Sequence, residues 1–288
     1  MSSSEPRLPL ELELEAFTTT ARLYPKSIPN LLRVAHRVLT WIEPLLYETL
    51  IFSSDNLPHL RYALETKPPT FWSRNVGNLL IPGYLGMQNR VLALSVLSAC
   101  ASVRNLCINI REDLLPLLVE PQLQMILRET CAFSPHGIFM SVTHLTVLDF
   151  DPRAIGTREL AAFPALTHLC FRIVYDPEAL HCALAQCAQL EVLITCKVFE
   201  STLEKTCQTL FDREFTSGGP FNYCDPRFVL MPMTFDEIVK NWESGARARV
   251  QGGWDFWKRA EAFVEKKRRG EVKPESRCWI EESDMIPY

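Results

Sequence analysis

The chain has 288 residues, which is enough for one large domain or two small ones. Hydrophobic residues make up 47% of it and charged residues 22%, and this balance excludes a mostly disordered chain. The 30 basic and 34 acidic residues leave a net charge of −4, so no overall positive field draws the protein to nucleic acid or to anionic membranes.

Neither a leader nor a membrane span is expected from the pattern of apolar residues. The N-terminal stretch MSSSEPRLPLELELEAF is acidic and lacks the basic start and apolar run of a signal peptide. The longest nearly apolar run, at residues 91–101, is about half of the ~20 residues that cross a bilayer. The ten cysteines show no CxxC spacing, and several lie in apolar stretches, as reduced buried thiols do. We therefore expect a cytoplasmic or nuclear protein without a cofactor.

Helical periodicity predicts a compact helical unit over residues 1–48. Leu10, Leu14, Phe17 and Ala21 follow the spacing of one helix face. Ser27 can cap a second helix. The apolar face of that second helix consists of Leu31, Val34, Ala35, Val38, Trp41, Ile42 and Leu45.

An internal repeat occupies residues 49–211. Its pattern is an apolar residue, two residues of any kind, an apolar residue, one of any kind and an apolar residue. The copies begin at Val76, Val103, Val142, Leu166 and Leu190. Their spacings are 27, 39, 24 and 24 residues, and a further copy near 123–126 would divide the longest one. Periods of this length with a strand pattern are typical of leucine-rich repeats.

A helix is predicted between the last two copies of the repeat. Asp176-Pro177-Glu178 supplies an N-cap, a first-turn proline and a first-turn acid. The residues that then share one helix face are Leu180, Ala183, Leu184, Cys187 and Ala188. Alternating strands and helices predict an α/β fold, which we interpret as an irregular leucine-rich-repeat-like solenoid in which each unit covers its neighbour.

Residues 212–288 predict a loop followed by a helical cap. Thr234-Phe-Asp-Glu237 is a capping box, and the helix it opens has an apolar face of Phe235, Ile238, Val239 and Trp242. A second helix is expected from near Trp254 to Gly270. Its apolar face consists of Trp254, Trp257, Ala260, Phe263 and Val264. We expect this helix to cover the open end of the solenoid.

A family resemblance starts from the N-terminal segment. Leu8-Pro9-Leu10-Glu11-Leu12 resembles the LPxE(I/L) opening of an F-box, and residues 31–47 resemble its later helices. F-box-like helices followed by repeats are similar to the F-box/leucine-rich-repeat class. Longer segments resemble a group of such proteins from mushroom-forming fungi to which no activity is assigned. These segments are residues 23–47, 141–145, 164–169, 225–231 and 254–271.

The resemblance implies that the N-terminal helices bind a Skp-type adaptor of an SCF-type ubiquitin ligase, and through it a cullin. The adaptor-binding residues would be Leu8, Pro9, Glu11 and Leu12. The variable strand positions, which mix polar and apolar groups as protein-binding surfaces do, would then read a protein target on the concave face. They are Asn78, Asn105, Cys107, His144, Thr146, His168, Cys170 and Arg172. Alternatively, the N-terminal helices only cap the core, and the protein is a non-catalytic leucine-rich-repeat binding or scaffold protein without a ubiquitin-ligase link.

Sequence motifs of catalysis are absent. The chain contains no GxGxxG, phosphate-binding loop, GxSxG, HExxH or kinase motif, so we do not expect an enzyme. His144 and His168 occupy equivalent places in neighbouring repeats and should be neighbours in a parallel sheet. They can bind a metal with Cys170 or Asn105, or form a polar ladder on an exposed face; we expect the ladder and no metal. The basic run KKRR at residues 266–269 fits a solvated helix end or a nuclear signal.

Overall fold

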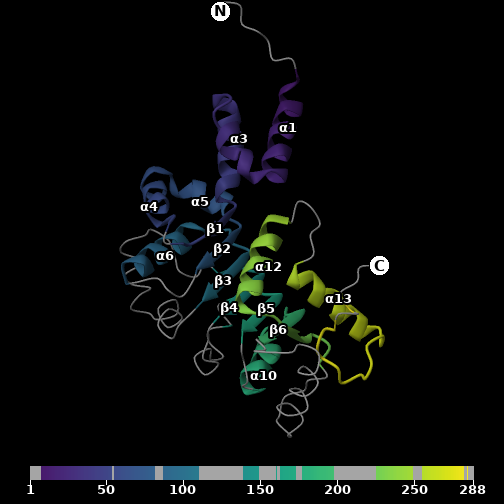
Figure 1. The fold of residues 1–288 in the computed structure, drawn as a ribbon. Coiled ribbons are helices and arrows are strands. Elements are labelled where there is room, and N and C mark those ends of the chain that lie inside the picture. Colours follow the sequence, from purple (N-terminus) through teal and green to yellow (C-terminus); the bar gives the residue numbers. More distant parts are fainter. Residues whose placement is uncertain are drawn as a thin grey trace, which may run out of the picture.

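A computed structural model of the chain describes residues 8–53, 55–81, 87–109, 139–148, 160, 163–172, 177–197, 225–248, 255–281 and 284. Its centre is a seven-stranded sheet in which every strand is parallel to its neighbours and the strand order follows the chain order (Figure 1). The strands are β1 (Thr49–Ile51), β2 (Asn78–Ile81), β3 (Asn105–Asn109), β4 (His144–Leu148), β5 (His168–Arg172), β6 (Val192–Lys197) and β7 (Phe228–Pro232).

Helices cover both faces of this sheet, and a further helical unit precedes it. Four helices share a buried cluster with one face: α4 (Leu57–Thr66), α5 (Pro69–Asn75), α6 (Met87–Ala99) and α10 (Pro177–Gln186). Two helices share a second cluster with the opposite face: α12 (Phe235–Ala248) and α13 (Phe256–Arg268). The N-terminal unit, which projects from the β1 end of the sheet in Figure 1, comprises α1 (Leu10–Leu23), the 3₁₀ turn η1 (Pro25–Ser27), α2 (Ile28–Leu31) and α3 (His36–Tyr47).

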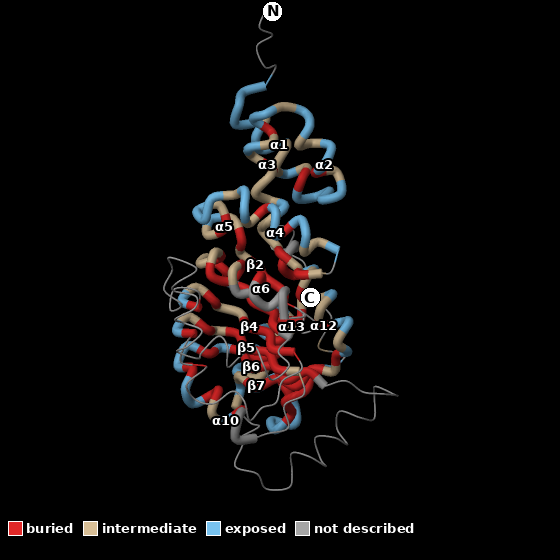
Figure 2. Tube along the Cα trace, turned by 90° about the vertical axis from the view of Figure 1, so that its left-hand side faces the viewer, coloured by how far each residue is buried: buried red, intermediate tan, exposed pale blue. Residues whose placement is uncertain are grey.

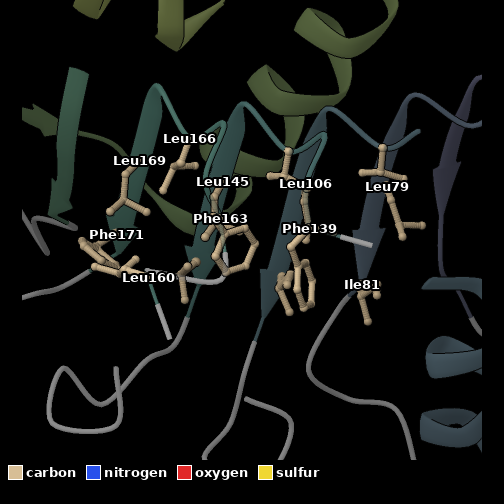
Figure 3. Close-up of a cluster of buried hydrophobic side chains, with 14 of the residues drawn as sticks. Leu79, Ile81, Leu106, Phe139, Leu145, Leu160, Phe163, Leu166, Leu169 and Phe171 are labelled. Atoms are coloured by element: carbon tan, nitrogen blue, oxygen red, sulfur yellow. The ribbon is translucent and has the colours of Figure 1, made fainter. Parts of the chain in front are cut away.

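The repeat face of the sheet, which we define as the face toward α4, α5, α6 and α10, carries the apolar residues of the repeat. Leu79, Leu106, Leu145, Leu169 and Leu193 pair in one continuous row across β2 to β6, and all five are buried. Figure 3 shows the labelled leucines and the phenylalanines between them gathered on one side of successive strands. Each such leucine contributes about 1.5–3 kcal/mol relative to an exposed one. The predicted repeat register is confirmed, because the paired leucines lie in the main apolar core.

The cap face of the sheet, which we define as the face toward α12 and α13, is also buried. Strand residues that alternate with the repeat positions pack against the two C-terminal helices. They are Leu80, Cys107, Leu148, Cys170, Val192, Ile194, Cys196, Val229 and Met231. Figure 2 shows the strands after β1 as mostly buried, as is usual for parallel sheets with helices on both faces.

The expectation of an irregular leucine-rich-repeat-like solenoid is therefore wrong. The structure has an α/β arrangement of one all-parallel sheet between two helical layers, without an open concave face. β7 belongs to the segment for which we expected only a loop and a cap, and α13 lies over the cap face rather than over the end of a stack. The repeat pattern predicts which strand residues point to one face of the sheet. It does not predict what covers the other face.

Local predictions within the described residues agree with the structure in several places. In the capping box, Glu237 accepts hydrogen bonds from the Thr234 amide and hydroxyl at 2.7 and 2.9 Å, and the Glu237 amide donates to Thr234 Oγ1 at 3.2 Å. Trp257, Ala260, Phe263 and Val264 are buried on α13 as expected. The chain leaves that helix at Gly270, which has a φ of 71°. Trp254 and the repeat copy at 123–126 lie outside the described residues.

The predicted second N-terminal helix is divided in the structure. Residues 27–45 form η1, α2 and α3 with a break before His36, and the Ser27 hydroxyl donates to the Tyr24 carbonyl at 2.7 Å instead of capping a helix. Val34, which the periodicity placed on the apolar face, is exposed at the break. The apolar spacing continues through the break because α2 and α3 both face the same small core.

Candidate functional site

The N-terminal helical unit has its own small core. Ala21, Ile28, Val38 and Ile42 are buried in it, and Phe17 packs against them. This cluster is separate from the two clusters on the sheet. This small core therefore holds α1 in place without contacts along the whole length of that helix.

A charged pair fixes the orientation of α1 against α3. Arg37 donates to Glu13 through Nε at 3.0 Å and through Nη2 at 2.7 Å, a two-point contact between the first turns of the two helices. The hydrogen bond and the charge of Glu13 raise the pKa of Arg37 above its usual value. Because Glu13, Phe17 and Ala21 face α3, the other side of α1 is turned away from the unit.

The first turns of α1 expose apolar side chains. Leu8 is 53% exposed, Leu12 is 52% exposed and Leu10 is 51% exposed. Leu14, which shares the predicted apolar helix face with Leu10, is exposed as well. Figure 2 shows this end of α1 as exposed on the tube. Pro9 and Glu11 of the predicted adaptor-binding set are also exposed, so all four predicted residues lie on the accessible end of the unit.

The other end of the unit packs on the sheet domain. Tyr47, at the end of α3, makes edge contacts with the rings of Phe71 and Trp72 at centroid distances of 5.1 and 5.4 Å. Lys67 Nζ lies 2.6 Å from Glu43 Oε1. Contacts of this kind are required if the unit caps the β1 end of the sheet. One end of the unit is therefore docked on the sheet domain, and the other end is exposed.

The predicted target-binding set does not form an accessible surface. Six of its members are buried beneath α12 and α13, and His144 and Arg172 are half-buried. The buried six are Asn78, Asn105, Cys107, Thr146, His168 and Cys170. The expectation of an exposed concave face is therefore wrong, because the C-terminal helices fold back over it instead of extending the stack.

The first positions of the strands form a polar row under those helices. Asn78 pairs with Asn105, Asn105 with His144 and His144 with His168 across adjacent strands. Asn105 Oδ1 accepts a hydrogen bond from Trp242 Nε1 of α12 at 2.8 Å. The polar row is therefore an attachment line for the C-terminal helices: Trp242 satisfies Asn105, whereas Asn78 Oδ1 and His168 Nε2 have no hydrogen-bond partner among the described residues.

The two histidines of the row stack on each other and meet α13. Their ring centroids lie 4.1 Å apart with the planes within 9° of parallel, so the predicted neighbour relation is confirmed. Trp257 contacts both rings edgewise, at 5.4 and 5.5 Å. Glu261 Oε1 lies 3.1 Å from His168 Nε2. The contact of Glu261 with His168 was not predicted from the sequence, because no sequence pattern links a surface position of a C-terminal helix to a strand that lies far earlier in the chain.

The buried thiols of the sheet are not activated. Burial raises the pKa of Cys107 and Cys170 far above the usual thiol value. Cys170 Sγ lies 3.6 Å from Cys196 Sγ, and both belong to the cap-face cluster. A thiol that stays protonated and inaccessible is a poor nucleophile and a poor metal ligand, so these residues act as small apolar groups.

Part of the basic run at residues 266–269 is used within the fold. Lys267 Nζ donates to the carbonyls of Asp225 and Phe228 at 2.9 and 3.1 Å. Lys266 lies 3.6 Å from Asp284, and Arg269 lies 2.7 Å from Glu271. Lys266 and Lys267 therefore make contacts within the fold at the end of α13, and the choice between a solvated helix end and a nuclear signal stays a prediction.

Comparison of the chain with protein-family models, curated proteins and solved structures finds no match. Among the described residues, no helix combines the length and the apolar character needed to cross a bilayer.

Proposed function

We propose that this protein is an F-box-like interaction module whose N-terminal helices bind a Skp-type adaptor, which makes it a substrate receptor of an SCF-type ubiquitin ligase. The observation that carries the proposal is the exposed apolar end of α1, with Leu8, Leu10 and Leu12 each about half exposed. Large apolar side chains that are exposed at one end of a folded unit are typical of partner sites. The same residues carry the resemblance to an F-box opening.

The electrostatics of this end favour a partner held by apolar burial. Glu13 is engaged by Arg37, and Glu11 lies beside the leucines. A partner surface with apolar pockets and a basic rim fits this combination. The protein would then act in the cytoplasm or the nucleus, where adaptor and cullin are found. The surface that holds the protein target is not the cap face, which α12 and α13 cover.

The runner-up is a non-catalytic binding or scaffold protein in which the N-terminal helices only cap the sheet. The contacts of Tyr47 with Phe71 and Trp72 favour it, because they dock the unit on the β1 end. The two functions differ in whether α1 needs to be accessible. A cap needs only its docked end, whereas a receptor needs the exposed end.

Adaptor binding is tested with the purified full-length protein and a purified Skp-type adaptor by isothermal titration calorimetry. The double variant Leu8→Ala, Leu12→Ala removes two apolar contacts, each worth roughly 1.5–3 kcal/mol when buried, and should weaken binding by at least about 100-fold. Tyr62→Ala, an equally exposed apolar position on α4, is the matched control and should bind like wild type. If the wild-type chain does not bind the adaptor under conditions where an ordinary F-box protein does, the ligase proposal is wrong and the scaffold function stands.

A further inference from the structure

Three side chains with metal-ligating atoms meet between the sheet and α13. They are His144 of β4, His168 of β5 and Glu261 of α13. One ligand atom of each lies within 4.8 Å of the other two. Imidazole nitrogens and a carboxylate oxygen are ligands that zinc and related divalent ions take in proteins.

The hydrogen bonds of the preceding threonines favour a proton on Nδ1 of each ring. Thr167 Oγ1 donates to the Thr143 carbonyl at 3.1 Å, so its single proton is used there. The 2.8 Å contact between Thr167 Oγ1 and His168 Nδ1 must then be donated by the Nδ1–H group. The neutral His168 ring therefore keeps a lone pair on Nε2, the atom that points to Glu261.

The same arrangement is repeated one strand earlier. Thr143 Oγ1 donates to the Arg104 carbonyl at 3.3 Å and lies 2.9 Å from His144 Nδ1. Because the two rings are stacked in parallel and both use Nδ1 for the preceding threonine, their Nε2 edges face the same way. The two Thr–His pairs of the repeat thus act as two oriented ligands, each with a hydroxyl behind it that holds the ring.

The Nε2 atom of the buried ring faces Glu261. His168 is 5% exposed, and its Nε2 atom has no hydrogen-bond partner among the described residues. Its 3.1 Å approach to Glu261 Oε1 lacks hydrogen-bond alignment. A nitrogen lone pair and a carboxylate repel at this distance, and either a proton shared between them or a metal ion bound to both removes the repulsion.

The alternative ligands near the histidines are already used. Asn105 Oδ1 accepts the indole N–H of Trp242, and Cys170 is buried with its pKa raised and contacts Cys196. Glu261, whose side chain is 48% exposed, is the third group that can reach the ring nitrogens.

We propose that His144, His168 and Glu261 bind one divalent transition-metal ion, zinc by preference, and that this ion ties α13 to the central sheet. Three protein ligands leave a fourth position for water. A tetrahedral zinc with bonds of about 2.0–2.1 Å needs ligand atoms roughly 3.3 Å apart. Because the lone pairs of two stacked, parallel rings do not converge on one ion, reaching this geometry takes a tilt of at least one ring out of the stack and a rotation of Glu261, which is accessible from one side.

The outer side of the cluster, where Glu261 lies, borders a surface pocket. Glu261 lines a surface pocket together with Glu191, Val192, Lys258 and Glu265. The pocket is formed where α13 passes the start of β6. Metal binding there does not involve the adaptor surface, which lies on α1, so the two proposals are independent.

The experiment uses the full-length protein freed of metal by a chelator and titrated with Zn²⁺ in competition with a chromophoric chelator. We expect one equivalent to bind and to raise the thermal midpoint. Glu261→Gln, which keeps the shape of the side chain, and Thr167→Val, which removes the hydroxyl behind His168, should each weaken zinc binding by at least about 10-fold. Glu275→Gln, an exposed carboxylate beyond the end of α13, and His181→Gln on α10 are the matched controls and should bind zinc like wild type.

Co²⁺ identifies the ligands, because a cysteine site gives an intense thiolate-to-metal band that a histidine–carboxylate site lacks. We expect the visible bands of a four-coordinate ion without the thiolate band, and their loss in His168→Gln. The proposal is overturned if no equivalent of zinc binds, if Glu261→Gln binds as tightly as wild type, or if the thiolate band appears. Glu261 lies on the surface, so its variant remains informative even where His168→Gln does not fold.

Discussion

The two faces of the sheet are buried to a similar extent but by different chemistry. The repeat face is covered by helices that alternate with the strands, and its row from Leu79 to Leu193 is apolar throughout. The cap face is covered by α12 and α13, which come from the end of the chain, and it combines apolar side chains with Asn78, Asn105 and the two histidines.

The two faces therefore differ in how strictly their contacts depend on the alignment of atoms. Apolar burial tolerates small shifts of a covering helix, because it depends on area rather than on the alignment of atoms. Asn105 and His168 instead need a partner at a particular place, since a buried polar group without one costs free energy. The repeat face should therefore respond to lost volume, and the cap face to lost partners.

The largest effect is expected on the repeat face. Leu169→Ala removes a fully buried side chain from the centre of the leucine row and should lower the free energy of unfolding by about 2–5 kcal/mol. Urea denaturation measures this loss. Leu46→Ala, at an exposed leucine of α3, is the control and should change little. An unchanged midpoint for Leu169→Ala would mean that the row is not the core.

A smaller effect of another kind is expected on the cap face. Trp242→Phe removes the indole N–H and leaves Asn105 Oδ1 buried without its donor, which should cost about 1–3 kcal/mol in addition to lost packing. In an Asn105→Ala background the same change should cost less, because no acceptor is left unpaired. Equal losses in both backgrounds, measured by urea denaturation, would show that the hydrogen bond contributes nothing and that both faces rest on packing alone.

The smallest effect appears at alkaline pH and involves one thiol from each face. Burial raises the pKa of Cys100, in the repeat-face cluster, and of Cys107, in the cap-face cluster. Above about pH 8.5 the unfolded thiols lose protons that the folded ones keep, so the free energy of unfolding falls as pH rises, by up to about 1.4 kcal/mol per pH unit for each thiol. Urea denaturation between about pH 9 and 10 should show a shallower decline for Cys107→Ala than for wild type or for Leu46→Ala. Identical slopes would place the Cys107 thiol in contact with water.

Several elements could be predicted because their signals are local. The capping box at Thr234 and Glu237 places the start of α12 within four residues of sequence, and the hydrogen bonds agree. The apolar spacing on α13 predicted that Trp257 and Phe263 are buried. Leu10 and Leu14 show the limit of such spacing, since a helix can show an apolar face without a neighbour that covers all of it.

The sequence contained an indication that the cap face is covered, but we interpreted these strands only as having one exposed face. Strands such as NLLI at 78–81 and VLITCK at 192–197 are apolar at consecutive positions, as strands buried on both faces are. The asparagines and histidines among them favoured an exposed surface. Polar residues at buried positions become acceptable only when a partner is supplied, and Trp242 supplies one to Asn105 from far along the chain.

By itself, the sequence determined strands β2 to β6, their register and the helix at 177–186, because the apolar period acts between residues that are close in the chain. Only the tertiary structure decided which surfaces remain accessible and which groups meet. It closed the cap face with α12 and α13, left the end of α1 open and brought Glu261 to His168. The physical reason is that the burial of a side chain depends on whichever element covers it, and here that element comes from the other end of the chain.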